Sequence, residues 1–242
     1  MRGSPNASRA VTIIIPAFNE SVLLDHTVSE VLKAVDVLTD YELILVNDGS
    51  GDDTGLRMER LRNEYPHLVV VHHPRNYGLG ASYATGVFLA TKPFVVMFPG
   101  DNCFRSDSIE SIFRCIGNSD ILIPYHLNAD SARGPARRLL SSWYTRFANI
   151  LSGADVPYYN GTVVHKTEMV QQFGIRTNGF AYQLDLLVRL LASGARYDTV
   201  GINLTERAKG KTKAFRIKNV MQVAFVFLRL IVRRLIAWIA PT

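Results

Sequence analysis

The chain has 242 residues, 48% of them hydrophobic, and only two cysteines, which excludes both a disordered chain and a small secreted scaffold held by disulfides. Nine of its 27 Lys and Arg residues follow position 204, while the other 18 basic residues are balanced by 20 acidic ones, so the net charge of +6 belongs to the C-terminal end. A basic tail on a nearly neutral folded part argues against nucleic-acid binding, which places cations in a folded groove.

Residues 1–10 are polar and lack the apolar stretch of a signal peptide, so we expect a disordered segment or a cloning remnant outside the fold. Apolar runs of strand type then alternate with segments of helical spacing. The runs are VTIII (11–15), ELILV (42–46), LVVV (68–71), FVVMF (94–98) and DILIP (120–124), and the helical segments are 24–35, 54–65, 81–90 and 108–116. Continuous apolar runs indicate strands buried on both faces. The sequence therefore predicts an α/β fold with a mostly parallel, doubly wound sheet.

Polar loops follow the first four predicted strands. They are PAFNE (16–20), NDGSGDDT (47–54), HHPRNYGLG (72–80) and PGDN (99–102). In sheets of this kind ligands bind outside the carboxyl ends of the strands, so we expect the four loops to share one site. No Gly-x-Gly-x-x-Gly follows the first strand and no Gly-Lys-Ser/Thr loop occurs, which argues against a dinucleotide oxidoreductase and a P-loop NTPase.

With these motifs in this order, residues 11–213 resemble the family 2 glycosyltransferases, which have the GT-A fold. The later segments 121–149, 178–194 and 205–213 are similar to dolichol-phosphate mannose synthases and related polyprenyl-phosphate glycosyltransferases. The resemblance implies an inverting enzyme that moves a hexose from a nucleotide-diphosphate sugar, of GDP-mannose or UDP-glucose type, to a polyprenyl or dolichyl phosphate. It also implies that this happens at the cytoplasmic face of the membrane.

The resemblance implies a donor site on the first three loops. The residues expected to contact the nucleotide sugar are Pro16, Ala17, Phe18, Asn19, Glu20, Asp48, Gly49, Asn76 and Gly80. A leaving diphosphate needs Mg²⁺ or Mn²⁺, and Asp101 is the expected ligand, with Asn102 beside it. Pro99 replaces the first Asp of the family's Asp-x-Asp motif, so we expect a weakly held cation that the diphosphate itself helps to bind. VPYYNGT (156–162) departs from the mannose synthase pattern, which leaves the sugar open.

A phosphate acceptor is already largely ionised at pH 7, so it needs cationic side chains and no general base. The expected acceptor-phosphate residues are Arg133, Arg137, Arg138, Arg207 and Lys213. Asp101 and Arg207 are expected to be catalytic. Asp185, on a predicted helix, is expected either near the acceptor as a catalytic group or in a salt bridge.

Two other functions stay open from the sequence. A family 2 transferase that uses a hydroxyl of a soluble sugar or lipid would need a general base, for which Asp185 is the candidate. A catalytically silent GT-A module would bind the nucleotide sugar without transferring it, and the reduced Asp-x-Asp motif favours this reading. Detectable donor hydrolysis or transfer separates the silent module from both enzymes.

The C-terminal residues 214–242 are predicted to form a basic amphipathic helix. Its polar side is expected to carry Lys218, Gln222, Arg229 and Arg233, and its apolar side Val220, Ala224, Phe227, Leu228, Ile231, Leu235 and Trp238. The longest uncharged run, 219–228, is half of the ~20 residues that span a bilayer. We therefore expect a peripheral protein that meets the inner membrane face through this helix. Packing on the domain, or on another subunit of an oligomer, is the alternative.

Overall fold

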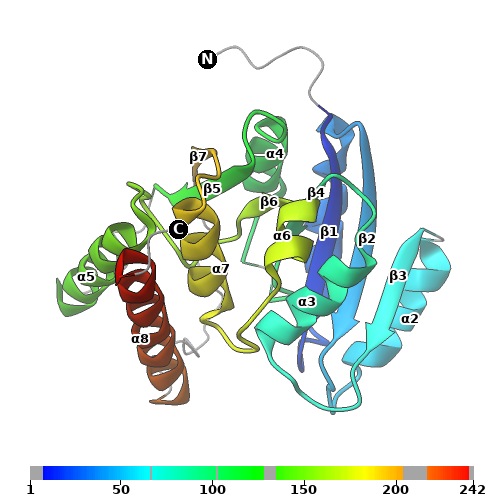
Figure 1. The fold of residues 1–242 in the computed structure, drawn as a ribbon. Coiled ribbons are helices and arrows are strands. Elements are labelled where there is room, and N and C mark those ends of the chain that lie inside the picture. Colours follow the sequence, from blue (N-terminus) through cyan, green and yellow to red (C-terminus); the bar gives the residue numbers. More distant parts are fainter. Residues whose placement is uncertain (1–7, 66, 102, 128–134, 204–216, 240–242) are drawn as a thin grey trace.

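The computed structural model describes residues 8–65, 67–101, 103–127, 135–203 and 217–239 (Figure 1). Strands and helices alternate over most of this length, as the sequence predicts. In chain order the elements are β1 (Ala10–Ala17), α1 (Leu24–Leu32), the 3₁₀ turn η1 (Val35–Val37), β2 (Asp40–Asn47), α2 (Thr54–Glu64), β3 (Leu68–His72), α3 (Leu79–Leu89), β4 (Phe94–Met97), α4 (Ser106–Arg114), β5 (Ile121–His126), α5 (Pro135–Ser152), β6 (Val164–Lys166), α6 (Thr167–Phe173), α7 (Tyr182–Ala192), β7 (Tyr197–Ile202) and α8 (Ile217–Ile239).

The strands form one seven-stranded sheet in the order β3-β2-β1-β4-β6-β5-β7. The pairs β1·β2, β1·β4, β2·β3 and β5·β7 are parallel, whereas β6 runs antiparallel to both β4 and β5. The sheet is therefore mostly parallel, which confirms the predicted fold class. Because β1, β2 and β4 are parallel neighbours, their carboxyl ends lie at one edge, at the bottom of Figure 1.

Helices cover both faces of the sheet, and each face has its own apolar core. Every residue of β1 is buried, with Ile13 and Ile15 in the core beneath α1, α2 and α4, and Ile14 in the core beneath α3 and α7. This division follows from the alternation of side chains along a strand. On α3, a Cβ at Gly86 would lie 2.5 Å from Ile14 Cδ1, so a glycine there lets the helix approach the sheet closely.

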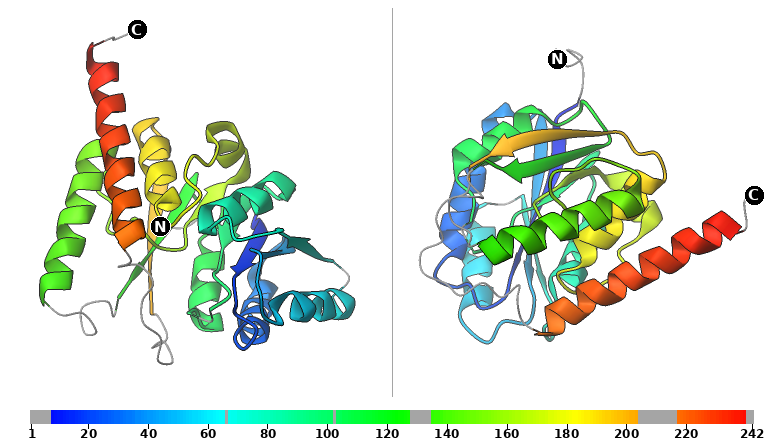
Figure 2. Two further views of the ribbon diagram at one scale, coloured as in Figure 1. Left: turned by 90° about the horizontal axis from the view of Figure 1, so that it is seen from below. Right: turned by 90° about the vertical axis from the view of Figure 1, so that its left-hand side faces the viewer.

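The last helix, α8, packs on the domain beside α5 and outside α7 (Figure 2). Val226 and Leu230 bury their side chains in this contact, at 1% and 5% exposure. Arg229, from the predicted polar side, turns toward the domain, whereas Leu228 and Leu235, from the predicted apolar side, are 59% and 53% exposed. The side chains of Lys218, Val220 and Trp238 lie outside the described part. Within the described residues, no helix has the length and hydropathy to cross a bilayer.

Candidate functional site

The loops after β1 and β4 meet at the carboxyl edge of the sheet. The backbone N–H of Gly100 donates to the carbonyl of Pro16 at 3.0 Å, and a Cβ on Gly100 would lie 3.0 Å from Ala17 Cβ. Asp101 follows at once, with its side chain half-buried. The structure therefore brings Asp101 next to Pro16 and Ala17, as expected from their strand-end positions. Their contact with a donor stays a prediction.

The loop after β1 is also joined to the loop after β2. Asn19 donates from its backbone N–H to Ser50 Oγ at 3.0 Å, and its Oδ1 accepts from the N–H of Gly51 at 2.9 Å. Among the described residues, Asn19 is the one non-glycine with a positive φ, 55°. Asparagine tolerates this left-handed conformation better than most residues. The reciprocal bonds hold it there and leave the ring of Phe18 39% exposed beside it.

A carboxylate in the second loop fixes the start of α2. Asp52 accepts hydrogen bonds from the backbone N–H of Thr54 at 3.0 Å and of Ser21 at 3.2 Å. Burial raises the pKa of Asp52, but hydrogen bonds from the side chains and the backbone N–H groups of Thr54 and Ser21 outweigh it and lower the pKa to about 2. The side chain is therefore charged at neutral pH. The carboxylate of Asp52 stabilises the loop, because its oxygens accept hydrogen bonds from Thr54 and Ser21.

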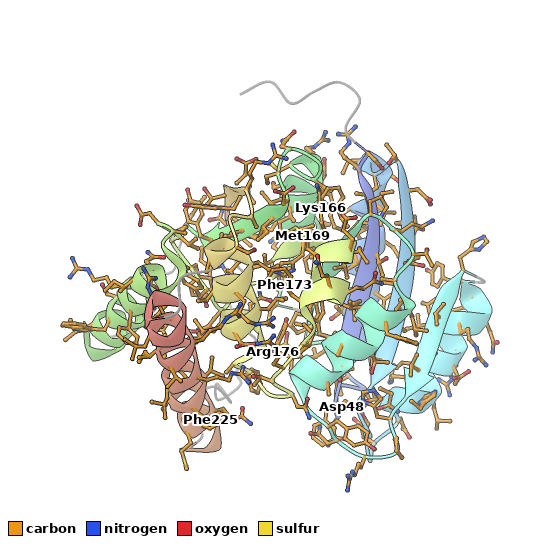
Figure 3. All side chains as sticks on the ribbon, in the orientation of Figure 1. Asp48, Lys166, Met169, Phe173, Arg176 and Phe225 are labelled. Carbon is orange, nitrogen blue, oxygen red and sulfur yellow. The ribbon has the colours of Figure 1, made fainter. Side chains whose placement is uncertain are left out.

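Asp48, expected to contact the donor, holds the loop after β3, and its contact with a donor stays a prediction. It is 4% exposed, and its carboxylate accepts from the backbone N–H groups of Tyr77 at 2.9 Å and Gly78 at 2.8 Å. The ring Nδ1 of His73 lies 2.8 Å from Asp48 Oδ1, and its Nε2 lies 2.9 Å from Thr85 Oγ1. Both carboxylate oxygens are thus occupied within the chain. Figure 3 shows Asp48 at the lower edge of the molecule, where β2 ends.

Replacing Asp48 with Ala should lower the free energy of unfolding by about 3 kcal/mol, because it leaves two backbone N–H groups without their charged acceptor. Urea unfolding measures this loss. Asp36→Ala, at an exposed position before β2, is the control and should change stability little. Unchanged stability together with lost nucleotide binding would show that Asp48 acts on the donor directly.

Two glycines allow the close approaches in this region. Gly49 has φ 69°, and a Cβ there would lie 2.3 Å from the backbone carbonyl carbon of Arg75. Gly78 has φ 102°, and a Cβ there would lie 2.6 Å from the carbonyl oxygen of Asn178. Side chains at either position would push these loops apart. The loop that contains Asn76 is therefore pressed against both the second loop and the segment before α7.

The segment before α7 is a part of the site that the motifs did not reveal. The carbonyl of Asn178 accepts from the backbone N–H groups of Gly80 at 2.7 Å and Ala81 at 3.3 Å, at the start of α3. The Asn178-Gly179 pair is a turn signal in the sequence, but nothing in it shows that the turn lies against α3. It closes one side of the expected donor site.

Asp185 makes the salt bridge that the sequence left as one alternative. It is 1% exposed, its Oδ2 lies 3.0 Å from Arg189 Nε, and its Oδ1 lies 2.5 Å from a terminal nitrogen of Arg229. Arg189 also donates to the carbonyls of Phe173 and Gly174, both at 2.7 Å. The carboxylate therefore joins α7 to α8, inside the protein.

The expected acceptor residues are only partly within reach of the structure. Arg133, Arg207 and Lys213 lie outside the described residues, as does Asn102. Arg137 and Arg138 lie on the first turn of α5, with side chains outside the described part. Their roles stay predictions.

Among the described residues, the side chains at the end of β4 offer few ligands for a divalent cation. Asp101 supplies a carboxylate, and the thiol of Cys103 donates to its Oδ1 at 2.7 Å. Over the described ranges, no group of three or more His, Cys, Asp or Glu side chains is placed to hold a metal ion. A single carboxylate is too few ligands for a preformed metal site, but it suits Mg²⁺ or Mn²⁺ that binds together with a diphosphate, whose oxygens supply further ligands. The residues present fit a cation held in this way.

Comparisons with known sequences agree with the motif reading. The model of the family described as "Glycosyl transferase family 2" matches residues 12–162, more than half of the chain. An undecaprenyl-phosphate mannosyltransferase of Micrococcus luteus is 24% identical over 213 residues, 84% of this chain and 86% of that protein. A polyprenol monophosphomannose synthase of Mycolicibacterium smegmatis is 26% identical, over 83% of this chain and 79% of that protein. A dolichyl-phosphate beta-glucosyltransferase of Trichomonas vaginalis is 26% identical over 148 residues, which is 56% of this chain and less than half, 46%, of that protein.

Solved structures share the fold at low sequence identity. A mannosyltransferase from Pyrobaculum calidifontis, in complex with GDP-Man and Mn²⁺, has a TM-score of 0.70 at 16% identity. The match covers 96% of this chain and 68% of the mannosyltransferase chain. Glucosyl-3-phosphoglycerate synthase from Mycobacterium tuberculosis, with Mn²⁺, UDP and glucosyl-3-phosphoglycerate, has a TM-score of 0.68 at 16% identity. That match covers 93% of this chain and 80% of the synthase chain. At these identities the likeness shows the GT-A fold alone.

Proposed function

Because the chain belongs to glycosyl transferase family 2, we propose that it is an inverting transferase that moves a hexose from a nucleotide-diphosphate sugar to a polyprenyl phosphate. Family membership and the GT-A fold confirm the resemblance and make the chain a glycosyltransferase. The observation that carries the acceptor class is the match to two polyprenyl-phosphate mannosyltransferases. It extends over more than four fifths of the chain and so reaches beyond the donor loops.

In this proposal the hydrogen-bonded loops after β1 and β2 hold the nucleotide. Asp101 lies beside Pro16, where the diphosphate would bind. A divalent cation, when bound with the donor, neutralises charge on the leaving diphosphate. The acceptor oxygen attacks the anomeric carbon as the bond to the diphosphate breaks, so the configuration inverts. A phosphate oxygen is already largely deprotonated at pH 7, so no side chain has to remove a proton.

The state of Asp185 supports a phosphate acceptor over a hydroxyl acceptor. A hydroxyl needs a general base within hydrogen-bond reach of its proton. Asp185, the candidate base, is 1% exposed and lies between two guanidinium groups. It would have to leave both to meet a substrate.

Transfer assays with GDP-mannose and UDP-glucose against undecaprenyl phosphate, and against the neutral alcohol undecaprenol, test the proposal. We expect transfer to the phosphate and none to the alcohol. Arg207→Ala should lower transfer by about tenfold or more while donor affinity stays, because it removes a charged contact to the acceptor. Arg60→Ala, on α2, is the control. Transfer to the alcohol would favour the hydroxyl alternative, and donor binding without transfer or hydrolysis would favour the silent module.

A further inference from the structure

The exposed sides of α5 and α8 are apolar along most of their length. On each helix the exposed large hydrophobic side chains recur at intervals of three or four residues, so they form one stripe. The stripe on α5 consists of Leu139, Trp143, Phe147 and Ile150, and the stripe on α8 consists of Met221, Phe225, Leu228, Val232 and Leu235, with exposures from 39% to 67%.

The two stripes belong to one surface, which we call the α5–α8 face. The ring of Phe147 on α5 lies 5.0 Å from the ring of Phe227 on α8, and Tyr144 lies 5.4 Å from the same ring. Arg234 bonds the carbonyl of Leu151 at 2.7 Å and so ties the far end of α8 to the end of α5. A shallow hollow of about 370 Å³ lies at this seam, lined by Leu151, Ile231, Arg234 and Leu235. Figure 2 shows both helices on the same side of the molecule.

The orientation of α8 is unusual for a helix on a protein that meets only water. Such a helix normally buries its apolar side and exposes its polar side. Here Arg229 turns inward to the buried Asp185, and the side chain of Gln222 packs against Gly179. The outward side carries Met221 and Phe225, at 67% and 65% exposure. An apolar stripe that continues across two helices marks an interaction surface.

The charges on these helices select the kind of partner. Over their 18 and 23 residues, α5 and α8 contain no Asp or Glu and six Lys or Arg besides Arg229, which is paired with the buried Asp185. A second copy of this chain would bring the same positive charges against them. An anionic lipid surface complements both the cations and the apolar side chains, and tryptophan favours the boundary between headgroups and acyl chains.

We propose that α5 and α8 together seat the protein on an anionic lipid surface, with Trp143 and Phe225 inserted at the headgroup boundary. The inference deepens the proposed function, because it names the surface from which a lipid acceptor would be taken. α8 begins at the edge where β1 and β2 end (Figure 1), and Figure 3 shows Phe225 and Asp48 at this same edge. The Phe225 end of the α5–α8 face therefore lies toward the donor loops.

Flotation with vesicles of phosphatidylglycerol and phosphatidylcholine in equal parts, free of polyprenyl phosphate, tests the proposal on the full chain. We expect the protein to bind these vesicles at least roughly tenfold more tightly than vesicles of phosphatidylcholine alone. Trp143→Ser and Phe225→Ser should each weaken it roughly tenfold, because each removes a large side chain from the apolar layer. Phe88→Ser is the matched control, since Phe88 is 84% exposed on α3, away from the α5–α8 face, and it should bind as the unchanged chain does.

Fluorescence tests the contribution of α5 separately. The chain has two tryptophans, so Trp238→Phe leaves Trp143 as the single emitter. Its emission should shift to shorter wavelength on the anionic vesicles. Binding without this shift, or binding that neither substitution weakens, would overturn the proposal. Self-association that both substitutions abolish, without vesicle binding, would assign the face to a second copy.

The proposed function and this inference fail in different assays. The vesicles contain no acceptor, so their binding does not depend on transfer. Nucleotide binding by Trp143→Ser and Phe225→Ser should match the unchanged chain, which shows that these variants are folded.

Discussion

Asp101→Asn should lower kcat/KM for transfer by about 100-fold, because it removes the carboxylate charge at the end of β4 while it keeps the shape of the side chain. The backbone bond between Gly100 and Pro16 holds this position against the loop after β1, so the substitution should not move it. Asp107→Asn, at an exposed carboxylate in the first turn of α4, is the matched control and should leave the rate unchanged. Rates with a saturating acceptor measure the effect.

Removal of the cation should have the same effect as Asp101→Asn. EDTA should lower transfer by about 100-fold, and Mn²⁺ or Mg²⁺ should restore it. Since Asp101 is the one carboxylate in its motif, we expect Mn²⁺ to bind measurably only when a nucleotide diphosphate is present, which electron paramagnetic resonance detects. Full activity in EDTA would exclude a metal role for Asp101. Tight Mn²⁺ binding without nucleotide would contradict the shared site.

The sequence predicted the strands of the parallel part closely, because each is a continuous apolar run. The predicted strand 42–46 lies within β2, and the predicted strand 94–98 is β4 with one added residue. The pattern did not reveal β6 and β7. β6 has three residues, too few for a period, and β7 is a half-buried edge strand with Asp198 and Thr199 in its middle.

The sequence predicted that the strand-end loops meet, but it did not predict the hydrogen bonds between them. Strand ends place Pro16, Asp48 and Asp101 at one edge, and this follows from parallel topology alone. The partners of Asp48, in contrast, are 29 and 30 residues away in sequence, at Tyr77 and Gly78. No local pattern shows that a loop folds back over a carboxylate.

The same limit applies to α5. Leu139, Trp143 and Ile150 recur at helical spacing, which in most proteins indicates a side turned to the core. Whether such a stripe is covered depends on what packs there. In this fold α5 instead buries Ala148 and Leu151, and the apolar stripe on α5 is exposed.

The largest expected loss of stability belongs to the ion pair that joins α7 to α8. Asp185→Asn should lower the free energy of unfolding by about 3–5 kcal/mol, because it leaves Arg189, whose side chain is 1% exposed, without its carboxylate. The exposed pair Glu110 and Arg114 has the same spacing on a helix, so Glu110→Gln is the matched control, expected to cost less than about 1 kcal/mol. Urea unfolding of both variants measures the difference.

Arg229→Gln should cost less than Asp185→Asn, because its side chain is 33% exposed and water can replace part of the lost contact. A double-mutant cycle between the two positions should give a coupling energy well above that of Glu110 and Arg114. Arg229 also bonds Thr177 Oγ1 at 3.2 Å, next to Asn178, which accepts from the start of α3. The pair therefore supports the start of α3, beside the expected donor site, through the segment before α7. If Asp185→Asn kept full stability yet lost transfer, Asp185 would be the general base for a hydroxyl acceptor. If the folded Asp185→Asn variant, assayed at low temperature, keeps its transfer rate, the role of Asp185 is to hold α8 in place.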